Sequence, residues 1–480
     1  MITSEEMAVV DENAAALGVP RKQLMESSGN AVARQVCALA EPDASVAVVV
    51  GRGNNGGDGL VAARFLDEFD VTVHLLGRAE SISTAISREN WAALQSAEYD
   101  AREVRDSRDL DLGSPDVVVD AMLGTGVTGD PREPERSAVE AVNESGAVVV
   151  AVDVPSGVDA DTGEAADPAV DADHVVTFHD AKPGLSDLDC EVTVADIGIP
   201  QFAERVVERG DLLRVTTDPG ATKGDSGRVF VIGGGPYTGA PALAGQGALR
   251  GGADLSFVAV PDSVSTPIQS YAEDLIVQPY EGDVLTPDRV DDLVETAESH
   301  DDVVVLGPGL GTADETLAAV GDFLESFTGR AVVDADALQV VPDVETDATL
   351  VCTPNRKELV DLGGPEVDDL REHADEVEHL AADLGQVVLA KGPTDVISDG
   401  ERTRVNRAGT PGMAVGGTGD TLAGVTAAFL ATQEPFDAAC IAPFVNGRAA
   451  ELLDDDVGDG LLASDLLDTI PRVVWGDDDA

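Results

Sequence analysis

Short apolar runs recur along the chain, and the segments between them have the apolar spacing of helices. The runs cover residues 46–50, 71–76, 116–119 and 147–152 in the first half, and 229–232, 256–260, 303–306, 331–333, 350–352 and 387–389 in the second. Continuous apolar runs of this length are typical of strands that are covered on both faces. Strands that alternate with helical segments predict α/β domains built on parallel sheets.

The first part of the chain has a strand, a glycine-rich turn and a helix in succession. Thr3 and Glu6 have the spacing of a capping box, which predicts a helix at the N-terminus. After the strand at 46–50 comes the glycine-rich stretch 51–59, which predicts a loop, and then a helical pattern over 60–69. This order is that of dinucleotide-binding domains, although the glycine spacing departs from GxGxxG.

The length of 480 residues is too great for one hydrophobic core and predicts two or three domains. Residues 208–220 lose their apolar periodicity and contain Gly210 and the turn sequence Asp218-Pro219-Gly220. We therefore predict two domains, residues 1–213 and 214–480.

The charge is strongly acidic, with 91 Asp and Glu against 30 Lys and Arg and a formal net charge of −61. Such a charge repels nucleic acids and anionic membranes, so neither is expected as a partner. The composition resembles that of proteins from extreme halophiles, in which salt of about 1 M shortens the Debye length to about 3 Å. The sequence contains no apolar run long enough for a membrane span, and Glu5 and Glu6 stand where a signal peptide would be basic, so we expect a cytoplasmic protein.

Polar residues follow several predicted strands at their carboxyl ends. In the first half these are Asn55, Asp120 and Asp153. Ligands of open α/β sheets bind outside the carboxyl ends of the strands, so these side chains are expected to line one crevice. Asn and Asp are common in turns, so each of these residues alone could be a turn residue. Three such residues at the ends of neighbouring strands indicate a binding site more strongly than a set of unrelated turns.

In the second half the strongest signal is the glycine-rich stretch 409–422, which runs directly into an apolar segment, 423–431. This pattern predicts a loop that leads into a helix whose first amides bind an anion. Asp420 is the candidate base, and the alternative is that Asp420 only caps the helix. The sequence contains no GxxxxGK[ST] motif, which argues against a P-loop ATPase.

The motifs of the first half resemble those of the NAD(P)H-hydrate epimerase family. They are Leu24-Met25-Glu26-Ser27-Ser28-Gly29, the stretches 53–59 and 120–126, Val152-Asp153-Val154-Pro155-Ser156-Gly157, Lys182-Pro183-Gly184-Leu185 and Asp196-Ile197-Gly198-Ile199-Pro200. The resemblance implies a Rossmann-like three-layer sandwich that interconverts the two C6 epimers of hydrated NADH and NADPH, called NADHX and NADPHX. It also implies that Asp153 is the acid/base and that K⁺ is bound by Asn55, Asp120 and Ser156. The implied substrate contacts are Asn54, Asn55, Gly56, Gly57, Asp58, Gly124, Thr125, Gly126, Val127, Thr128, Gly129, Asp130 and Asp153.

The motifs of the second half resemble those of the ribokinase-like, ADP- or ATP-dependent NAD(P)H-hydrate dehydratases. They are Gly307-Pro308-Gly309-Leu310-Gly311, Asp334-Ala335-Asp336-Ala337-Leu338, Thr353-Pro354-Asn355, Lys391-Gly392 and the stretch 409–420. The resemblance implies that ADP or ATP, with Mg²⁺, phosphorylates the C6 hydroxyl of the hydrate and that loss of phosphate restores NAD(P)H. Asp420 would be the catalytic base. The implied hydrate contacts are Ala240, Gly311, Asn355 and Asp420, and the implied nucleotide contacts are Lys391, Gly392, Pro393, Thr394, Asp395 and Gly419.

One position departs from the second family, because Asn355 stands where these enzymes usually have histidine. Asparagine forms hydrogen bonds but carries no proton charge, so activity is expected to survive if that histidine only positions the substrate.

The leading hypothesis is a bifunctional repair enzyme, in which the epimerase domain supplies the epimer, S-NAD(P)HX, that the dehydratase domain consumes. The alternatives are a ribokinase-like kinase for a small alcohol, with a regulatory first domain, and a first domain that serves only as a binding scaffold. A homo-oligomer is expected. The choices between ADP and ATP and between NADHX and NADPHX cannot be made from the sequence.

Overall fold

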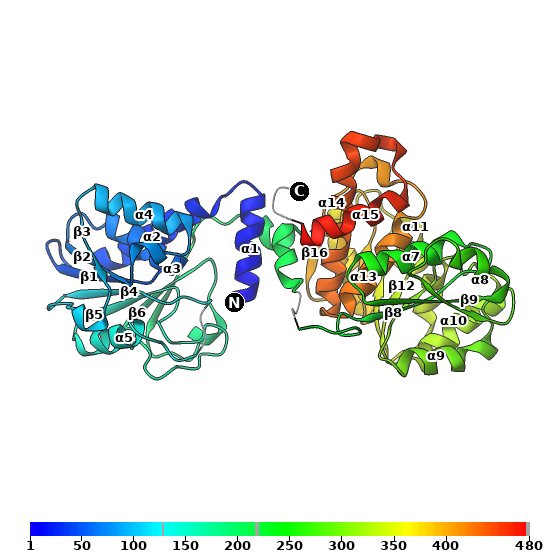
Figure 1. Ribbon diagram of the computed structural model, residues 1–480, viewed down its shortest axis with the longest axis horizontal. Coiled ribbons are helices and arrows are strands. Elements are labelled where there is room, and N and C mark those ends of the chain that lie inside the picture. The colour runs from blue at the N-terminus through cyan, green and yellow to red at the C-terminus, as the bar shows by residue number, and fades with distance from the viewer. Residues whose placement is uncertain (127–128, 217–219, 477–480) are drawn as a thin grey trace. The chain divides into compact units, whose positions relative to one another are not determined.

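The computed structural model describes residues 1–126, 129–216 and 220–476, which form two compact units, Met1–Ala203 and Glu204–Ala480 (Figure 1). Residue 213, where the sequence predicts the boundary, lies inside the second unit. Val206 pairs with Val405 in a parallel bridge, and Arg404 forms an ion pair with Asp211. The segment between the two sheets therefore packs as part of the second unit.

In the described residues of the first unit the strands form one seven-stranded sheet of order β3-β2-β1-β4-β5-β6-β7, with all neighbours parallel. The strands are β1 (Ser45–Val50), β2 (Asp70–Leu76), β3 (Asp100–Val104), β4 (Val117–Ala121), β5 (Val148–Val152), β6 (His174–Phe178) and β7 (Glu191–Ala195). The strand order reverses between β1 and β4, which is where doubly wound sheets bind their ligands.

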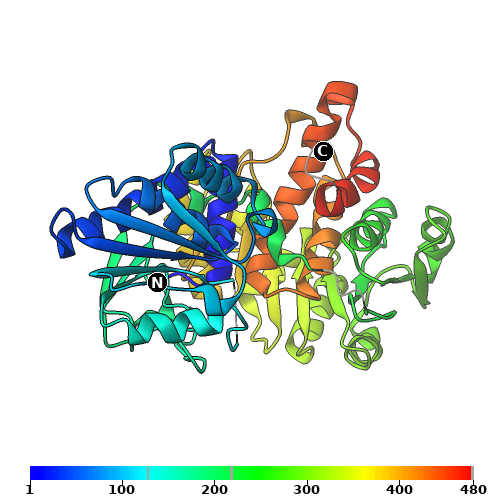
Figure 2. The ribbon, with the colours of Figure 1, turned by 60° about the vertical axis from the view of Figure 1, so that its left-hand side comes forward.

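Helices cover both faces of this sheet, as a three-layer sandwich requires. They are α1 (Ser4–Ala16), α2 (Arg21–Leu39), α3 (Asn54–Arg64), α4 (Ala85–Ser96) and α5 (Glu135–Glu144), followed by the short α6 (Phe202–Arg205). Val46, Val48 and Val50 pack in one core with α2 and α3, whereas Ala47 and Val49 pack in another core with α5. The two helix layers are separate in Figures 1 and 2, and the predicted α/β sandwich is confirmed.

Two predictions for this unit need correction. Helix α3 begins at Asn54, with Gly53 as its N-cap, so most of the predicted loop 51–59 is the first part of the helix. The glycines led to the prediction of a loop, but here they allow the helix to pack closely, and the amides of its first turn point back toward the strand ends. The strands β3, β6 and β7 were also not predicted from the apolar runs in the sequence. Both β3 and β7, which lie at the sheet edges, expose part of their length and therefore lack a continuous apolar pattern.

The described strands of the second unit form a nine-stranded sheet of order β10-β9-β8-β11-β12-β13-β14-β15-β16. They are β8 (Arg228–Ile232), β9 (Leu255–Pro261), β10 (Ile276–Tyr280), β11 (Val303–Leu306), β12 (Arg330–Val333), β13 (Thr349–Cys352), β14 (Val387–Ala390), β15 (Asp395–Ser398) and β16 (Thr403–Asn406). All pairs are parallel except β14 with β15 and β15 with β16. The order reverses between β8 and β11, and all six strands predicted from apolar runs are present.

The helices of the second unit are α7 (Gly239–Arg250), α8 (Asp262–Gln269), α9 (Val290–Glu298), α10 (Asp314–Ser326), α11 (Arg356–Asp361), α12 (Ala374–Leu384), α13 (Thr418–Leu430), α14 (Pro435–Val457) and α15 (Ala463–Trp475). One face of the sheet packs in a single core with α7, α13, α14 and α15, and α9 and α10 lie on the other side (Figure 1). No helix within the described parts of the chain is long and apolar enough to cross a membrane.

Helix α13 packs against α7 with almost no space between the two backbones. A Cβ atom added to Gly424 would lie 1.9 Å from the carbonyl oxygen of Ala244, and one added to Gly247 would lie 2.5 Å from that of Thr421. Helix α13 presents the candidate base Asp420, so this contact fixes the position of the candidate site.

We expect Gly424→Val to lower the free energy of unfolding of the second unit by about 3 kcal/mol, because the added atoms must push the helices apart. Gly321→Ala is the matched control. It also lies inside a helix, but its nearest neighbours are 3.5 Å or more away, so it should be neutral or stabilise by about 0.5 kcal/mol. Chemical denaturation measures both. Equal stability of the two variants would contradict the role of this contact.

Candidate functional site

The first unit brings Asn55, Asp120 and Ser156 together at the carboxyl ends of its central strands. Asp120 ends β4, Asn55 lies in the first turn of α3 after β1, and Ser156 follows β5. The Asn55 amide donates to the carbonyl of Leu123 (3.0 Å), and the Ser156 hydroxyl accepts from the amide of the same residue (3.0 Å). The prediction that these strand ends meet therefore agrees with the geometry.

Asp120 is completely buried in this cluster. Its carboxylate accepts hydrogen bonds from the Ser156 hydroxyl (2.6 Å), the Ser156 amide (2.8 Å) and the Met122 amide (3.2 Å). Burial raises the pKa of Asp120 to about 6, although these hydrogen bonds oppose the shift. In the part of the chain that the structure describes, Asp120 forms no ion pair with a basic side chain, so hydrogen bonds alone stabilise its charge.

Asp153 lies beside this cluster, after β5, and has an unusual backbone conformation. Its φ is +65°, a value that non-glycine residues adopt rarely and that is found at functional sites. Its side chain is 15% exposed. Oδ1 accepts a hydrogen bond from the Thr177 hydroxyl (2.9 Å) and forms an ion pair with Lys182 Nζ (3.1 Å). Sequence analysis selected Asp153 but assigned no role to Thr177 or Lys182.

Two further carboxyl groups lie near Asp153. Burial raises the pKa of Asp11 on α1 to about 6, and the charge of Asp153 adds to the shift. Burial also raises the pKa of Asp58 on α3, and the charges of Asp153 and Asp11 add to it. The crevice thus combines a carboxylate that is paired with lysine and carboxyl groups that hold protons readily. Such a contrast is typical of acid/base sites.

The other predicted contacts of the first unit lie in two segments. Residues Asn54, Asn55, Gly56, Gly57 and Asp58 form the start of α3. Gly124 lies against Asn55, since a Cβ at Gly124 would be 3.0 Å from the Asn55 Cβ, and Thr125 and Gly126 continue from it. Val127 and Thr128 lie outside the described residues. Beyond them, Gly129 precedes Asp130, whose carboxylate accepts from the Asp167 amide (3.4 Å).

In the second unit the predicted loop leads into α13 at Thr418, as expected. Gly417 is the N-cap, with φ +102°, and no side chain caps this helix. Asp420 lies in the first turn but is not the cap, so the alternative reading of Asp420 as a capping residue is wrong. The uncapped amides at the start of α13 are available to an anionic ligand.

Lys391 lies directly beside the start of α13. Its Nζ is 2.7 Å from Oδ1 of Asp334, which also accepts from the Thr353 hydroxyl (2.8 Å). A Cβ at Gly419 would be 3.3 Å from this Nζ, so only a glycine leaves the lysine unobstructed there. Burial opposes the charge of Lys391, but Asp334 and Glu358 outweigh burial and raise its pKa. The lysine is therefore a fixed cation next to the predicted anion site.

Asp420 shares this crowded acidic environment. Burial raises its pKa to about 7, and the charge of Asp334 adds to the shift, whereas Lys391 opposes it. A carboxyl group with a pKa near neutrality is suited to take a proton from a hydroxyl group.

The predicted nucleotide segment consists of the turn between β14 and β15, formed by Lys391, Gly392, Pro393 and Thr394, and of Asp395, the first residue of β15. The buried Asp395 carboxylate accepts from the Gly392 amide (2.9 Å) and from the Asn406 side chain (2.9 Å). Burial raises the pKa of Asp395 to about 6. Both of its oxygens are used inside the protein, so Asp395 shapes the turn.

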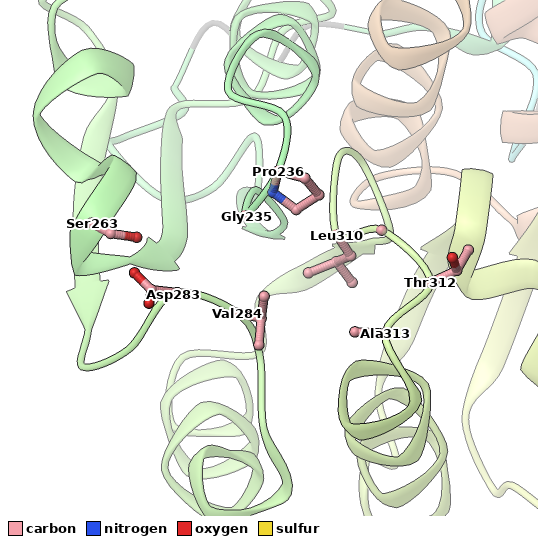
Figure 3. A pocket seen from close by; sticks show the side chains of 9 residues that line it. Gly235, Pro236, Ser263, Asp283, Val284, Leu310, Thr312 and Ala313 are labelled. Atoms are coloured by element: carbon pink, nitrogen blue, oxygen red, sulfur yellow. The ribbon is translucent and has the colours of Figure 1, made fainter.

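A cavity of about 460 Å³ opens where the strand order of the second unit reverses (Figure 3). It is lined by Gly235, Pro236, Ser263, Asp283, Val284, Leu310, Gly311, Thr312 and Ala313. Of the predicted hydrate contacts Gly311 lies in this lining, whereas Ala240 and Asn355 do not. Ala240 is in the first turn of α7, and Asn355 caps α11 by accepting from the amides of Lys357 and Glu358.

No group of three or more His, Cys, Asp or Glu side chains that suits a metal ion occurs in the parts of the chain that the structure describes.

Both halves of the chain match family models. Residues 21–184 match the model described as the YjeF-related protein N-terminus, and residues 229–472 match the model described as NAD(P)H-hydrate dehydratase. The proteins called bifunctional NAD(P)H-hydrate repair enzyme Nnr are similar over almost the whole length. The protein from Methanothermobacter thermautotrophicus is 44% identical and the alignment covers 98% of this chain and 94% of that protein. The protein from Pyrobaculum aerophilum is 44% identical, with 98% of each chain covered.

A solved structure also resembles the second part of the chain. The hypothetical protein SMU.573 from Streptococcus mutans has a TM-score of 0.50 at 24% identity, over 56% of this chain and 98% of that chain. This similarity supports the fold alone.

Proposed function

This chain belongs to the family of bifunctional NAD(P)H-hydrate repair enzymes. From this membership we propose which reaction each of its two sites catalyses. The first unit carries the epimerase and the second unit carries the nucleotide-dependent dehydratase. The observation that carries the proposal is an aspartate at a strand-end crevice in each unit: Asp153 is paired with Lys182, and Asp420 lies at the start of α13 beside Lys391.

In the first unit, Asp153 acts on the C6 hydroxyl of the hydrate. C6 carries both this hydroxyl and the ring nitrogen N1. When Asp153 takes the hydroxyl proton, a C=O bond forms, the C6–N1 bond breaks and N1 receives the proton. Closure of the ring on the opposite face of C6 reverses these steps and gives the other epimer. No co-reactant is consumed, so general acid/base catalysis by the protein is sufficient.

The donor set around Asp120 fits a potassium ion. The Asp120 carboxylate, the Ser156 hydroxyl and the Leu123 carbonyl are hard oxygen ligands joined by hydrogen bonds, and the Asn55 side-chain amide contacts the same carbonyl. The buried Asp120 forms no ion pair with a basic side chain among the described residues. A bound K⁺ would balance this charge and would hold the ends of β1, β4 and β5 in place for the substrate.

We expect potassium to stabilise the first unit at pH 7.5 and to lose this effect as the pH falls through about 6. The pKa of Asp120 is raised to about 6, so at lower pH its carboxyl group is neutral and attracts the cation less. A K⁺ concentration of 100 times the Kd would stabilise by about 2.7 kcal/mol. Thermal unfolding in KCl and in equal tetramethylammonium chloride measures the difference, and Asp120→Asn should abolish it. A potassium effect that persists in this variant would contradict the assignment.

In the second unit, Asp420 takes the proton of the C6 hydroxyl while the amides at the start of α13 hold the phosphoryl group. Lys391, fixed by Asp334 and Thr353, adds a positive charge beside this group. Mg²⁺ would neutralise the nucleotide phosphates when bound. The predicted hydrate contact Gly311 is among the residues that line the cavity between the ends of β8 and β11, which supports binding of the hydrate there.

The repair assay tests this proposal. Mixed epimers of NADHX are supplied with ADP or ATP and Mg²⁺, and the absorbance of reduced nicotinamide is followed. We propose that absorbance returns with at least one nucleotide and that both epimers are consumed. A folded sample that restores no absorbance with either nucleotide, but phosphorylates a small alcohol, would support the kinase alternative. Family membership does not favour that alternative.

The cytoplasmic location, the homo-oligomer and the adaptation to high salt remain predictions from the sequence. We propose that activity requires molar KCl, because a formal charge of −61 favours expansion of the chain when it is not screened.

A further inference from the structure

Lys182 is a lysine without any exposed side-chain surface, which is rare for this residue type. Lys182 follows β6, and its Nζ contacts three oxygens: Asp153 Oδ1 (3.1 Å), the Phe178 carbonyl (2.9 Å) and the Asp180 carbonyl (3.3 Å). Burial of a lysine costs free energy unless its charge and its hydrogen-bond donors are satisfied. All three contacts contribute to this, but only the first involves a group of the epimerase site.

The two carboxylate oxygens of Asp153 differ in the number of protein groups that contact them. Thr177 donates a hydrogen bond to Oδ1 and Lys182 forms an ion pair with the same oxygen, whereas within the described residues Oδ2 makes no hydrogen bond or ion pair. The side chain is nevertheless 15% exposed, and its backbone is held at φ +65° by the hydrogen bond from its amide to the Val176 carbonyl (2.8 Å). One oxygen is therefore fixed by the protein, while the other is free for a ligand.

On the basis of the proposed epimerase function, we infer that Lys182 is a positioning residue, which holds Oδ1 of Asp153 so that Oδ2 receives the proton of the C6 hydroxyl. The O–H bond of the hydroxyl breaks and an O–H bond to Oδ2 forms. The proton then passes from Oδ2 to N1 as the C6–N1 bond opens, and returns when the ring closes. Lys182 keeps its own proton throughout and does not touch the substrate.

Epimer exchange without nucleotide isolates this site, because the second unit is then idle. Purified R-NADHX is incubated with the full chain, and its conversion to S-NADHX is measured by chromatography above the enzyme-free rate. We expect Lys182→Met to lower kcat for exchange at least tenfold and to leave KM within twofold, because the lysine acts through Asp153. Lys22→Met removes an exposed lysine from the same unit, one that is paired with Glu89, and should change neither constant.

A double-variant cycle separates positioning from a merely structural role. If Lys182 acts through Asp153, adding Lys182→Met to an Asp153→Asn chain should lower exchange no further. Dehydration of S-NADHX by each variant, with nucleotide supplied, reports that the second unit is intact.

If Lys182→Met prevents the first unit from folding, Thr177→Val tests whether the position of Oδ1 of Asp153 controls epimer exchange. This change removes one donor from Oδ1 and leaves every contact of Lys182 in place, so kcat should fall several-fold with KM unchanged. Wild-type kcat in Thr177→Val and in any folded Lys182→Met chain would overturn the positioning role of Lys182 and leave the proposed epimerase function standing. Wild-type exchange by Asp153→Asn would overturn the proposed epimerase site itself.

Discussion

Replacing Asp420 with asparagine is expected to lower kcat/KM for dehydration of S-NADHX by about 10²–10⁴-fold, the usual contribution of a general base. Asparagine has nearly the same shape but cannot take a proton from the C6 hydroxyl. Epimer exchange by the first unit should continue at the wild-type rate. Asp468→Asn, on a residue that is 84% exposed in the same unit, is the matched control and should retain both activities.

The pH dependence of dehydration by the wild-type enzyme is a second test of Asp420 as the base. The base must be unprotonated, and burial together with Asp334 raises the pKa of Asp420 to about 7. We therefore expect kcat/KM for dehydration to fall about tenfold per unit as the pH decreases below about 7. A dehydration rate that is independent of pH between 5 and 8, or an Asp420→Asn chain with wild-type activity, would contradict the assignment of Asp420 as the base.

Replacing Asp153 with asparagine is expected to lower epimer exchange by about 10²–10⁴-fold and to leave dehydration of S-NADHX unchanged. The asparagine amide cannot take the hydroxyl proton, and it removes the charge that pairs with Lys182. With mixed epimers and nucleotide, this variant should restore absorbance rapidly until the initial S epimer is exhausted, and afterwards no faster than the enzyme-free conversion of R to S allows. Exchange and dehydration are measured separately by omitting or adding the nucleotide.

Asp106→Asn changes an exposed aspartate of the first unit that is paired with Arg108, and it serves as the control for Asp153→Asn. It should exchange epimers like the wild type. If Asp153→Asn also exchanged like the wild type, the proposed epimerase site would be wrong, and Asp58 and Asp11, whose carboxyl groups interact with Asp153, would be the next residues to replace.

Much of the sheet architecture and the location of both sites could be predicted from the sequence. Central strands such as β1 and β4 are buried on both faces, so their apolar runs are continuous and easy to recognise. Asp120 and Asp153 follow such strands, and parallel strands bring their carboxyl ends to one edge of the sheet. Asn55 lies in the first turn of α3, directly after β1, so the same reasoning predicts that Asn55, Asp120 and Asp153 share one crevice.

Contacts that depend on strand order and on side-chain packing could not be predicted. Lys182 meets Asp153 because β6 lies next to β5, and β6 is not among the strands predicted from apolar runs. The start of α3 was misplaced because glycines usually mark loops, whereas here they lie within a closely packed helix.

The two units share an arrangement that the sequence does not reveal. In the first unit Thr177 and Lys182 both contact Oδ1 of Asp153, and in the second unit Thr353 and Lys391 both contact Oδ1 of Asp334. In each case a threonine and a lysine fix an aspartate at a strand end. The aspartate is the proposed acid/base group in the first unit, whereas in the second it positions the lysine beside Asp420.

Complementation between variants is the most direct test that two separate sites act on one damaged coenzyme. R-NADHX, nucleotide and Mg²⁺ are supplied to the Asp153→Asn chain, to the Asp420→Asn chain, and to an equal mixture of the two. Neither chain alone should restore the absorbance of reduced nicotinamide faster than the enzyme-free conversion of R to S allows, and the mixture should restore it fully, because one chain makes S-NADHX and the other dehydrates it. Restoration by either chain alone at the rate of the mixture, or none by the mixture, would contradict the account.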